Sequence, residues 1–93
     1  MEFENKNRLI ELAVNDFGSL IKKYRKENLL TLEDISSLIG CSSSYIFRIE
    51  RNMRKPSIDF KVKVLTKVLN WSPQDIHAFL EKVIEKENLE TED

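Results

Sequence analysis

Apolar residues recur along this chain at the three- and four-residue spacing of amphipathic helices. In the central segment this spacing predicts one helix over residues 32–39 and a second over residues 43–51. The apolar positions of the first helix are Leu32, Ile35, Leu38 and Ile39. Those of the second are Ile46, Ile49 and Met53, which we expect to face inward. The segment 31–51 therefore predicts two short helices joined by a tight turn.

Residues at the ends of these two helices favour the same boundaries. Thr31 can cap the first helix, and Asp34, three residues later, can complete a capping box. Gly40 can end that helix, because a residue without Cβ adopts the left-handed conformation at little cost. Ser42 can then cap the second helix.

The N-terminal segment 3–27 also has a helical pattern. Its apolar stripe consists of Phe3, Ile10, Val14, Phe17, Ile21 and Tyr24. The phase of the stripe continues through Gly18, so the segment predicts either one long helix or two nearly collinear helices. Leu9, Leu12 and Ala13 widen the apolar face of the first part, which we therefore expect to pack on another element.

Two further helices are predicted in the C-terminal part. Ser57 can cap a helix over 58–70, whose core-facing positions are Ile58, Val62, Leu65 and Leu69, with a second stripe at Phe60, Val64 and Val68. Trp71 is expected in the core. Ser72, Pro73 and Asp75 are typical of a helix start. The helix that follows, to about residue 88, carries Ile76, Phe79, Leu80 and Val83 on its apolar side.

Several short motifs follow one another in a fixed order between residues 17 and 71. They are the opening FGSLIKKYRKE at 17–27, the glycine turn, the serine-capped helix, Ile49-Glu50-Arg51, and Pro56-Ser57. This ordered set resembles the Cro/cI-type (XRE-like) helix-turn-helix family of DNA-binding regulators, and its opening is most similar to SinR-type repressors. The resemblance implies an all-α fold, a compact five-helix lambda-repressor-like domain with an N-terminal helical extension. It divides the chain into the extension at 1–16, a DNA-binding domain at 17–71, and a C-terminal helix with an acidic tail at 72–93.

The resemblance makes the helix at 43–51 the reader of double-stranded DNA, because the family inserts it in the major groove, where base edges differ. Ser43 and Ser44 match the base-contacting positions of the family. Arg48 is long enough to hold guanine O6 and N7 with two hydrogen bonds. Phe47 is expected on the same face, either against thymine methyl groups or partly buried against the loop at 52–56.

Other residues are expected to position the protein without reading sequence. The expected phosphate contacts are Ser42, Arg51, Arg54, Lys55, Lys22 and Lys23. For Lys22 and Lys23, a favourable interaction with the helix dipole is an alternative of equal weight. In the family the residues that match Arg25 and Glu50 commonly pair, so we expect a structural ion pair there.

The distribution of charge agrees with this interpretation, although the formal net charge is −1. Residues 19–67 contain eleven Lys/Arg and five Asp/Glu, a balance of +6, whereas the two ends contain four against eleven. The basic excess therefore coincides with the predicted helix-turn-helix.

Composition excludes most other function classes. The 93 residues fit one domain, and no long apolar run predicts a membrane span. The chain has one cysteine and one histidine, and neither a phosphate-binding glycine loop nor a metal-ligand spacing occurs. We therefore expect no enzyme activity, no cofactor and no metal, and a cytoplasmic location. Cys41 is expected to be a small packed residue in the turn.

The expected partners are a pseudo-palindromic DNA operator and a second copy of the chain. Surplus apolar surface on 1–16, on the helix at 58–70 and on the last helix favours a homodimer, unless these segments cover one another in a monomer. A protein-interaction module or antitoxin-like protein with the same fold is the alternative function. A regulatory protein partner is a further expectation, since no ligand-sensing domain is apparent.

Overall fold

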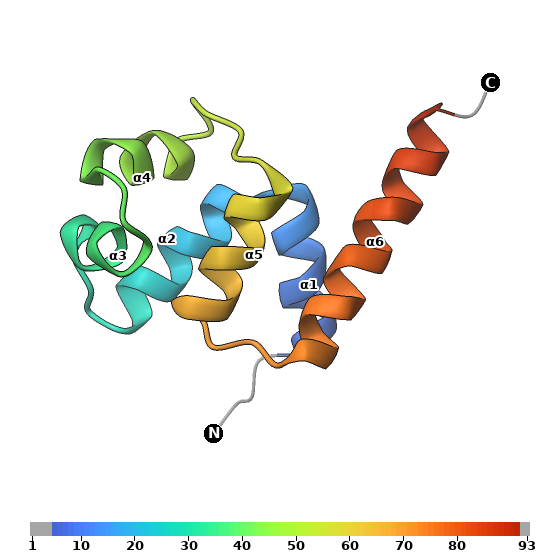
Figure 1. The fold of residues 1–93 in the computed structure, drawn as a ribbon, viewed down its shortest axis with the longest axis horizontal. Helices are drawn as coiled ribbons and strands as arrows, with labels where there is room; N and C mark the ends of the chain where they lie inside the picture. Colours follow the sequence, from blue (N-terminus) through green and yellow to red (C-terminus); the bar gives the residue numbers. More distant parts are fainter. Residues whose placement is uncertain (1–4, 92–93) are drawn as a thin grey trace.

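The computed structural model describes residues 5–91, with side chains described as far as Asn88. This part of the chain is entirely helical apart from its turns (Figure 1). Its helices are α1 (Lys6–Asn15), α2 (Phe17–Glu27), α3 (Leu32–Ile39), α4 (Ser43–Glu50), α5 (Ile58–Lys67) and α6 (Pro73–Thr91). The all-α class is confirmed for the described residues, where α1 lies within the predicted N-terminal extension and five helices follow it.

A single residue, Asp16, separates α1 from α2. Its backbone leaves the helical region (φ −152°, ψ 69°), and its N–H still donates to the Leu12 carbonyl oxygen, 2.7 Å away. The Asp16 carboxylate accepts from the backbone N–H of Ser19 at 3.3 Å and from its hydroxyl at 2.7 Å. Asp16 therefore ends one helix and caps the next. Of the two alternatives predicted for residues 3–27, the single long helix is therefore excluded and two helices are present, while Phe3 lies outside the described residues.

One hydrophobic core joins all six helices. Its buried side chains are Ile10, Ala13, Phe17, Leu20, Ile21, Ile35, Ile39, Ile46, Ile49, Val64, Leu65, Val68, Trp71 and Phe79. α1 packs against both α2 and α6, as Figure 1 shows. The N-terminal extension thus packs on other elements of the same chain, as its wide apolar face predicts.

The burial of α5 differs from the prediction of which apolar residues face the core. Val64 and Leu65 are fully buried and Val68 nearly so, whereas Ile58, Val62 and Leu69 are only half-buried. The reason is that α5 lies between α3 and α6 and contacts both. The helix also ends at Lys67 rather than 70.

Met53 is a second correction, because it is 65% exposed instead of facing inward. The chain leaves the helix after Glu50, and Asn52 adopts a left-handed conformation (φ 61°). The Met53 N–H then donates to the Arg48 carbonyl oxygen. This turn interrupts the helical phase, so the apolar periodicity does not carry Met53 into the core.

The start of α6 is as predicted. The Ser72 hydroxyl accepts from the Asp75 N–H at 3.2 Å, and α6 begins at Pro73. Trp71 is buried, with the Lys6 ammonium 4.8 Å from its ring centroid. Within residues 5–91, no helix is both long and apolar enough to span a membrane.

Candidate nucleic-acid interface

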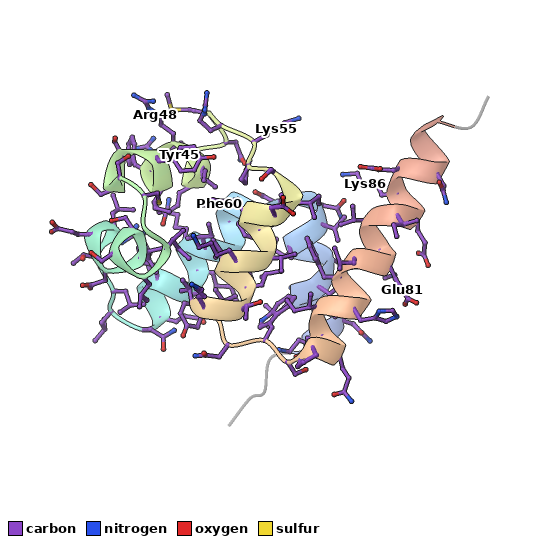
Figure 2. All side chains as sticks on the ribbon, in the orientation of Figure 1. Tyr45, Arg48, Lys55, Phe60, Glu81 and Lys86 are labelled. Atoms are coloured by element: carbon purple, nitrogen blue, oxygen red, sulfur yellow. The ribbon has the colours of Figure 1, made fainter. Side chains whose placement is uncertain are left out.

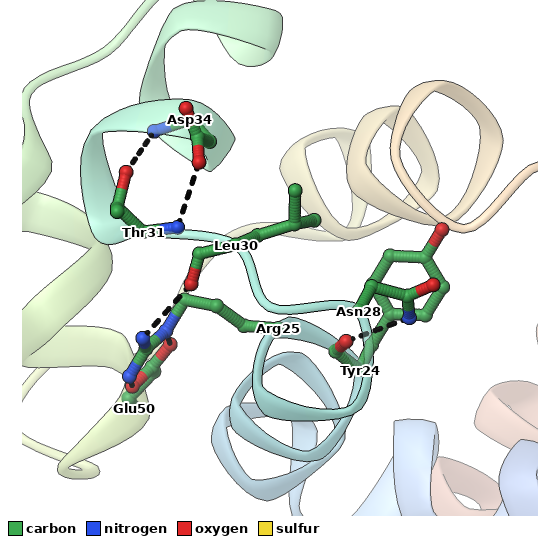
Figure 3. A network of polar contacts seen from close by, with 7 residues as sticks. All are labelled: Tyr24, Arg25, Asn28, Leu30, Thr31, Asp34 and Glu50. Atoms are coloured by element: carbon green, nitrogen blue, oxygen red, sulfur yellow. Dashed lines mark hydrogen bonds and ion pairs between the residues drawn. The ribbon is translucent and has the colours of Figure 1, made fainter.

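The α3–turn–α4 unit is built by three local devices. Thr31 and Asp34 form the predicted capping box, with bonds of 2.8 and 3.0 Å between each side chain and the other residue's N–H (Figure 3). Gly40 ends α3 in the left-handed conformation, at φ 87°. The Ser42 hydroxyl accepts from the Tyr45 N–H at 3.1 Å and so caps α4. These boundaries are confirmed, and α4 ends at Glu50 with Arg51 as its C-cap.

The backbone of α2 touches that of α4 at Gly18. A Cβ atom at this position would collide with the carbonyl oxygen of Ile49, so only glycine fits without a shift of one helix. In the sequence pattern, Gly18 is no more than a weak point in a helix. Its role depends on a contact with Ile49, 31 positions later, and the helical periodicity gives no information about such a distant contact.

Arg25 and Glu50 make a second link between α2 and α4. The Arg25 Nε lies 2.7 Å from Oε2 of Glu50, and Nη2 lies 3.0 Å from Oε1, a bidentate arrangement. The third donor, Nη1, reaches the carbonyl oxygen of Leu30 at 3.2 Å (Figure 3). The hydrogen bonds that Arg25 donates to the Glu50 carboxylate raise the pKa of Arg25 above its ordinary value, against the effect of burial. This is the pair expected from the family resemblance.

Clamped in this way, α4 presents a polar and basic face to solvent. Its exposed residues are Ser43, Ser44, Phe47, Arg48 and, at the C-cap, Arg51. Ile46 and Ile49 anchor the opposite face in the core. Arg48 lies at the upper edge of the molecule in Figure 2, on the same side as Lys55. The four proposed base-contacting residues are thus together on one face.

Aromatic rings support this face, and most of their contacts were not predicted from the sequence. Tyr45 and Phe60 meet edge to face, with centroids 5.2 Å apart and an interplanar angle of 88°. The Arg54 guanidinium lies 5.7 Å from the Tyr45 ring centroid, and that of Arg51 lies 4.9 Å from the Phe47 ring. Phe47 remains 40% exposed. Two expected phosphate-contacting arginines are thereby held beside α4 by cation–π contacts.

The expected phosphate contacts fall into two groups. Ser42, Arg51, Arg54 and Lys55 are exposed; Ser42 is the N-cap of α4, and the other three follow the end of that helix. Lys23 is placed elsewhere, because it pairs with Glu27 at 2.7 Å and lies in a hollow formed with α1 residues Arg8 and Leu9. The structure does not bring Lys23 to the face of α4. Lys22 is exposed on α2.

Among the residues that the structure describes, no three His, Cys, Asp or Glu side chains gather in a way that could hold a metal ion. Cys41 is half-buried in the turn. Burial raises the pKa of its thiol, only partly opposed by the charge of Lys63. A thiol with a raised pKa is less reactive at neutral pH.

Comparison with known proteins identifies a matching family and two relatives of this chain. A helix-turn-helix family matches residues 21–75, which include α3, the turn, α4 and α5. The HTH-type transcriptional regulator SinR of Bacillus subtilis (strain 168) is 39% identical over 71 residues, and SinR of Bacillus licheniformis shows the same identity and length. Each match covers 75% of this chain and 60% of the relative, so the chain spans less than two thirds of these proteins. No solved structure gives a significant match.

The family match covers more than half of the chain and includes the capped helix pair, the turn and Glu50 of the ion pair described above. The two relatives named above are HTH-type transcriptional regulators. The chain therefore belongs to the Cro/cI-type (XRE-like) helix-turn-helix family of DNA-binding transcriptional regulators.

Proposed function

We propose that this protein is a sequence-specific repressor that binds double-stranded DNA as a dimer and inserts α4 in the major groove. The observation that carries the proposal is the exposed face of α4, on which Ser43, Ser44, Phe47 and Arg48 stand together. This helix is fixed to α2 at Gly18 and through the Arg25–Glu50 pair. A reading helix held by two independent links keeps its side chains in register with base edges.

We assign base contacts and phosphate contacts by the length and position of each side chain. Arg48 is the residue able to grip a guanine with two hydrogen bonds, worth about 1–3 kcal/mol of discrimination. Ser42, Arg51, Arg54 and Lys55 hold phosphates and set the orientation of the helix. Both SinR relatives are named transcriptional regulators, which supports a regulatory role in the cytoplasm for this chain.

Some of the apolar residues expected to support a dimer are buried within one chain, so α6 becomes the main candidate surface. The extension and the second stripe of α5 were both expected to contribute, but Ile10 and Ala13 of the first and Val64 and Val68 of the second are buried within one chain. The outer side of α6 remains, where Ile84 is 58% exposed. A nearby groove of about 440 Å³ is lined by Thr66, Trp71, Pro73, Ile76, His77 and Leu80. A two-fold dimer would place two α4 helices in successive major grooves, about 34 Å apart.

The test is selection from a library of random duplexes at two salt concentrations, with wild type beside Arg48→Ala and Lys67→Ala. Lys67 is an exposed lysine in the last turn of α5 and serves as the matched control. We expect an enriched pseudo-palindrome for wild type and the control, and lost preference at one position of each half-site for Arg48→Ala. If no sequence is enriched and Arg48→Ala changes nothing, the protein-interaction alternative replaces DNA reading.

The dimer is tested separately by sedimentation equilibrium of wild type and Ile84→Glu. A charged residue in an apolar interface disfavours association, so the variant should be monomeric at concentrations where wild type is dimeric. Ile84 is exposed in one chain, so the variant should keep its circular dichroism spectrum. A wild type that is monomeric throughout rejects the dimer and leaves DNA reading intact.

A further inference from the structure

A basic cavity lies beside the proposed DNA-reading face, where the α1–α2 junction meets the loop at 51–57. Its volume is about 220 Å³, several times the share of one water molecule. Four of its lining residues are basic, namely Arg54, Lys55, Lys61 and Lys86, and one, Asp16, is acidic. The Asp16 carboxylate also accepts hydrogen bonds from the Ser19 N–H and hydroxyl. Because four basic residues face one carboxylate, the cavity has an excess of positive charge.

Lys61 is the innermost of these cations. It is only partly exposed, and its ammonium stands 5.7 Å from the centroid of the Phe17 ring. Burial lowers the pKa of Lys61, and the charges of Lys86 and Lys55 lower it further. All three lysines line this one cavity, and within residues 5–88 none of the three has an ion pair with an acidic side chain. An anion between them would relieve this repulsion.

Lys86 reaches this place from α6. In Figure 2 its side chain extends from α6 toward the rest of the molecule, whereas Glu81 lies on the far side of the helix. The same view places Lys86, Lys55 and Arg48 along one edge of the protein. A duplex lying on α4 along that edge would carry its backbone toward the cavity. The part of α6 that holds Lys86 lies beyond residue 75, where the family match ends.

We propose that Lys86, Lys61 and Lys55 form a phosphate site that holds a backbone phosphate of the DNA duplex bound by α4. The inference rests on the proposed function and extends the DNA footprint from α4 to α6. The ligand chemistry is a phosphate group, whose oxygens accept hydrogen bonds from lysine ammonium groups. The site carries no sequence information, because phosphate contacts position a protein without reading bases.

The experiment is anisotropy titration of one fluorescent duplex, carrying the selected sequence, between 50 and 200 mM salt. Wild type is compared with Lys86→Gln and with Lys67→Gln. Lys67 is an exposed lysine in the last turn of α5 that does not line the cavity, so it is the matched control. Each phosphate contact contributes about 0.9 to the slope of log affinity against log salt. We expect Lys86→Gln to lower the slope by about 1, so that wild type loses about fourfold more affinity over this range. Lys67→Gln should keep the wild-type slope.

The outcomes separate this inference from the proposed function. Wild type that binds no duplex overturns both. Duplex binding with an unchanged slope in Lys86→Gln and Lys86→Glu overturns the phosphate site alone. Lys86 is exposed, so neither variant should unfold, and circular dichroism checks this.

A second arm distinguishes DNA phosphate from free phosphate. Inorganic phosphate is titrated into wild type and Lys86→Gln at constant ionic strength, and the amide resonances of Gly18 and Lys61 are followed by NMR. If free phosphate shifts these resonances in wild type only, while the DNA salt slope is the same for both proteins, the cavity is a small-anion site and the inference is overturned. A reduced DNA slope in Lys86→Gln supports it.

Discussion

Arg25 of α2 and Glu50 of α4 hold each other through two parallel hydrogen bonds of 2.7 and 3.0 Å, with only 5% of the Glu50 side chain exposed. Removing one partner leaves a buried charge without its counter-ion, whereas removing both leaves none. Arg25→Met should therefore lower the free energy of unfolding by about 3 kcal/mol. The double variant Arg25→Met/Glu50→Leu should recover most of that loss. Urea unfolding measures both.

The control for this cycle is Lys22→Met, which removes an exposed positive charge from the same helix. It should change the free energy of unfolding by less than about 0.5 kcal/mol. The single variant Glu50→Leu completes the cycle. If the double variant loses as much free energy of unfolding as Arg25→Met and Glu50→Leu lose together, Arg25 and Glu50 act independently, contrary to the geometry.

Alanine at Gly18 and alanine at Gly40 should both destabilise the protein, but for different reasons. Gly18→Ala adds a Cβ against the Ile49 carbonyl oxygen, so α2 and α4 must separate. Overpacking of this kind costs about 1–3 kcal/mol, which exceeds the gain of about 1 kcal/mol in helix propensity. Gly40→Ala meets no atom within 4 Å but has to hold φ 87°, at a cost of about 1–2 kcal/mol.

DNA binding distinguishes the two glycine variants better than stability does. Gly18→Ala moves the reading helix relative to α2 and should weaken sequence preference even where the protein is fully folded. Gly40→Ala strains the turn without displacing α4 and should retain the preference of wild type. Equal sequence preference in both variants would contradict the role assigned to Gly18.

Sequence reasoning succeeded where the deciding contact is local. The caps at Thr31, Ser42 and Ser72 each join a side chain to a backbone N–H three residues later, so their positions follow from short motifs. Gly40 follows from the requirement for a left-handed residue at the end of a helix. The same reasoning located α3 at its observed bounds and α4 to within one residue.

Sequence reasoning failed where the deciding contact is distant or where a turn shifts the phase. The apolar stripe continues across Asp16, so periodicity could not decide between one helix and two, because one side chain and one backbone angle make the break. Met53 has helical spacing from Ile49, yet the left-handed Asn52 turns it to solvent. The Tyr45–Phe60 contact joins residues from two helices, and no spacing within either helix indicates it.

The Tyr45–Phe60 pair provides a test of how α5 supports the reading helix. Tyr45→Ala and Phe60→Ala each remove one ring, and the double variant completes a thermodynamic cycle in urea unfolding. We expect a coupling energy of about 0.5–1.5 kcal/mol, because edge-to-face rings attract beyond their buried area. Tyr45→Ala should also weaken DNA binding, since Arg54 loses the ring beneath it. A coupling energy near zero would mean that the two rings pack independently.

Lys6 and Asp75 join the beginning of α1 to the first turn of α6, with 3.3 Å between Nζ and Oδ2. Burial alone raises the pKa of Asp75, but the hydrogen bond and charge of Lys6, together with hydrogen bonds from Ser72, outweigh it, and the pKa lies below the ordinary 3.8. A carboxylate with a depressed pKa contributes stability above the unfolded-state value and loses it as pH falls through the folded-state value. The contribution should be at most about 1 kcal/mol, because both side chains are partly solvated.

The pair should therefore be visible as a pH-dependent difference between wild type and Asp75→Asn. The asparagine keeps the shape of the side chain but carries no charge for Lys6. Wild type should be the more stable protein at pH 7, and the difference should shrink below pH 3.8 as Asp75 takes up a proton. Urea unfolding between pH 2 and 7 measures it, with Lys82→Gln as a control, because Lys82 is exposed on α6 and keeps its charge over this range. A difference independent of pH would show that the charge of Asp75 contributes nothing to stability and would contradict the prediction.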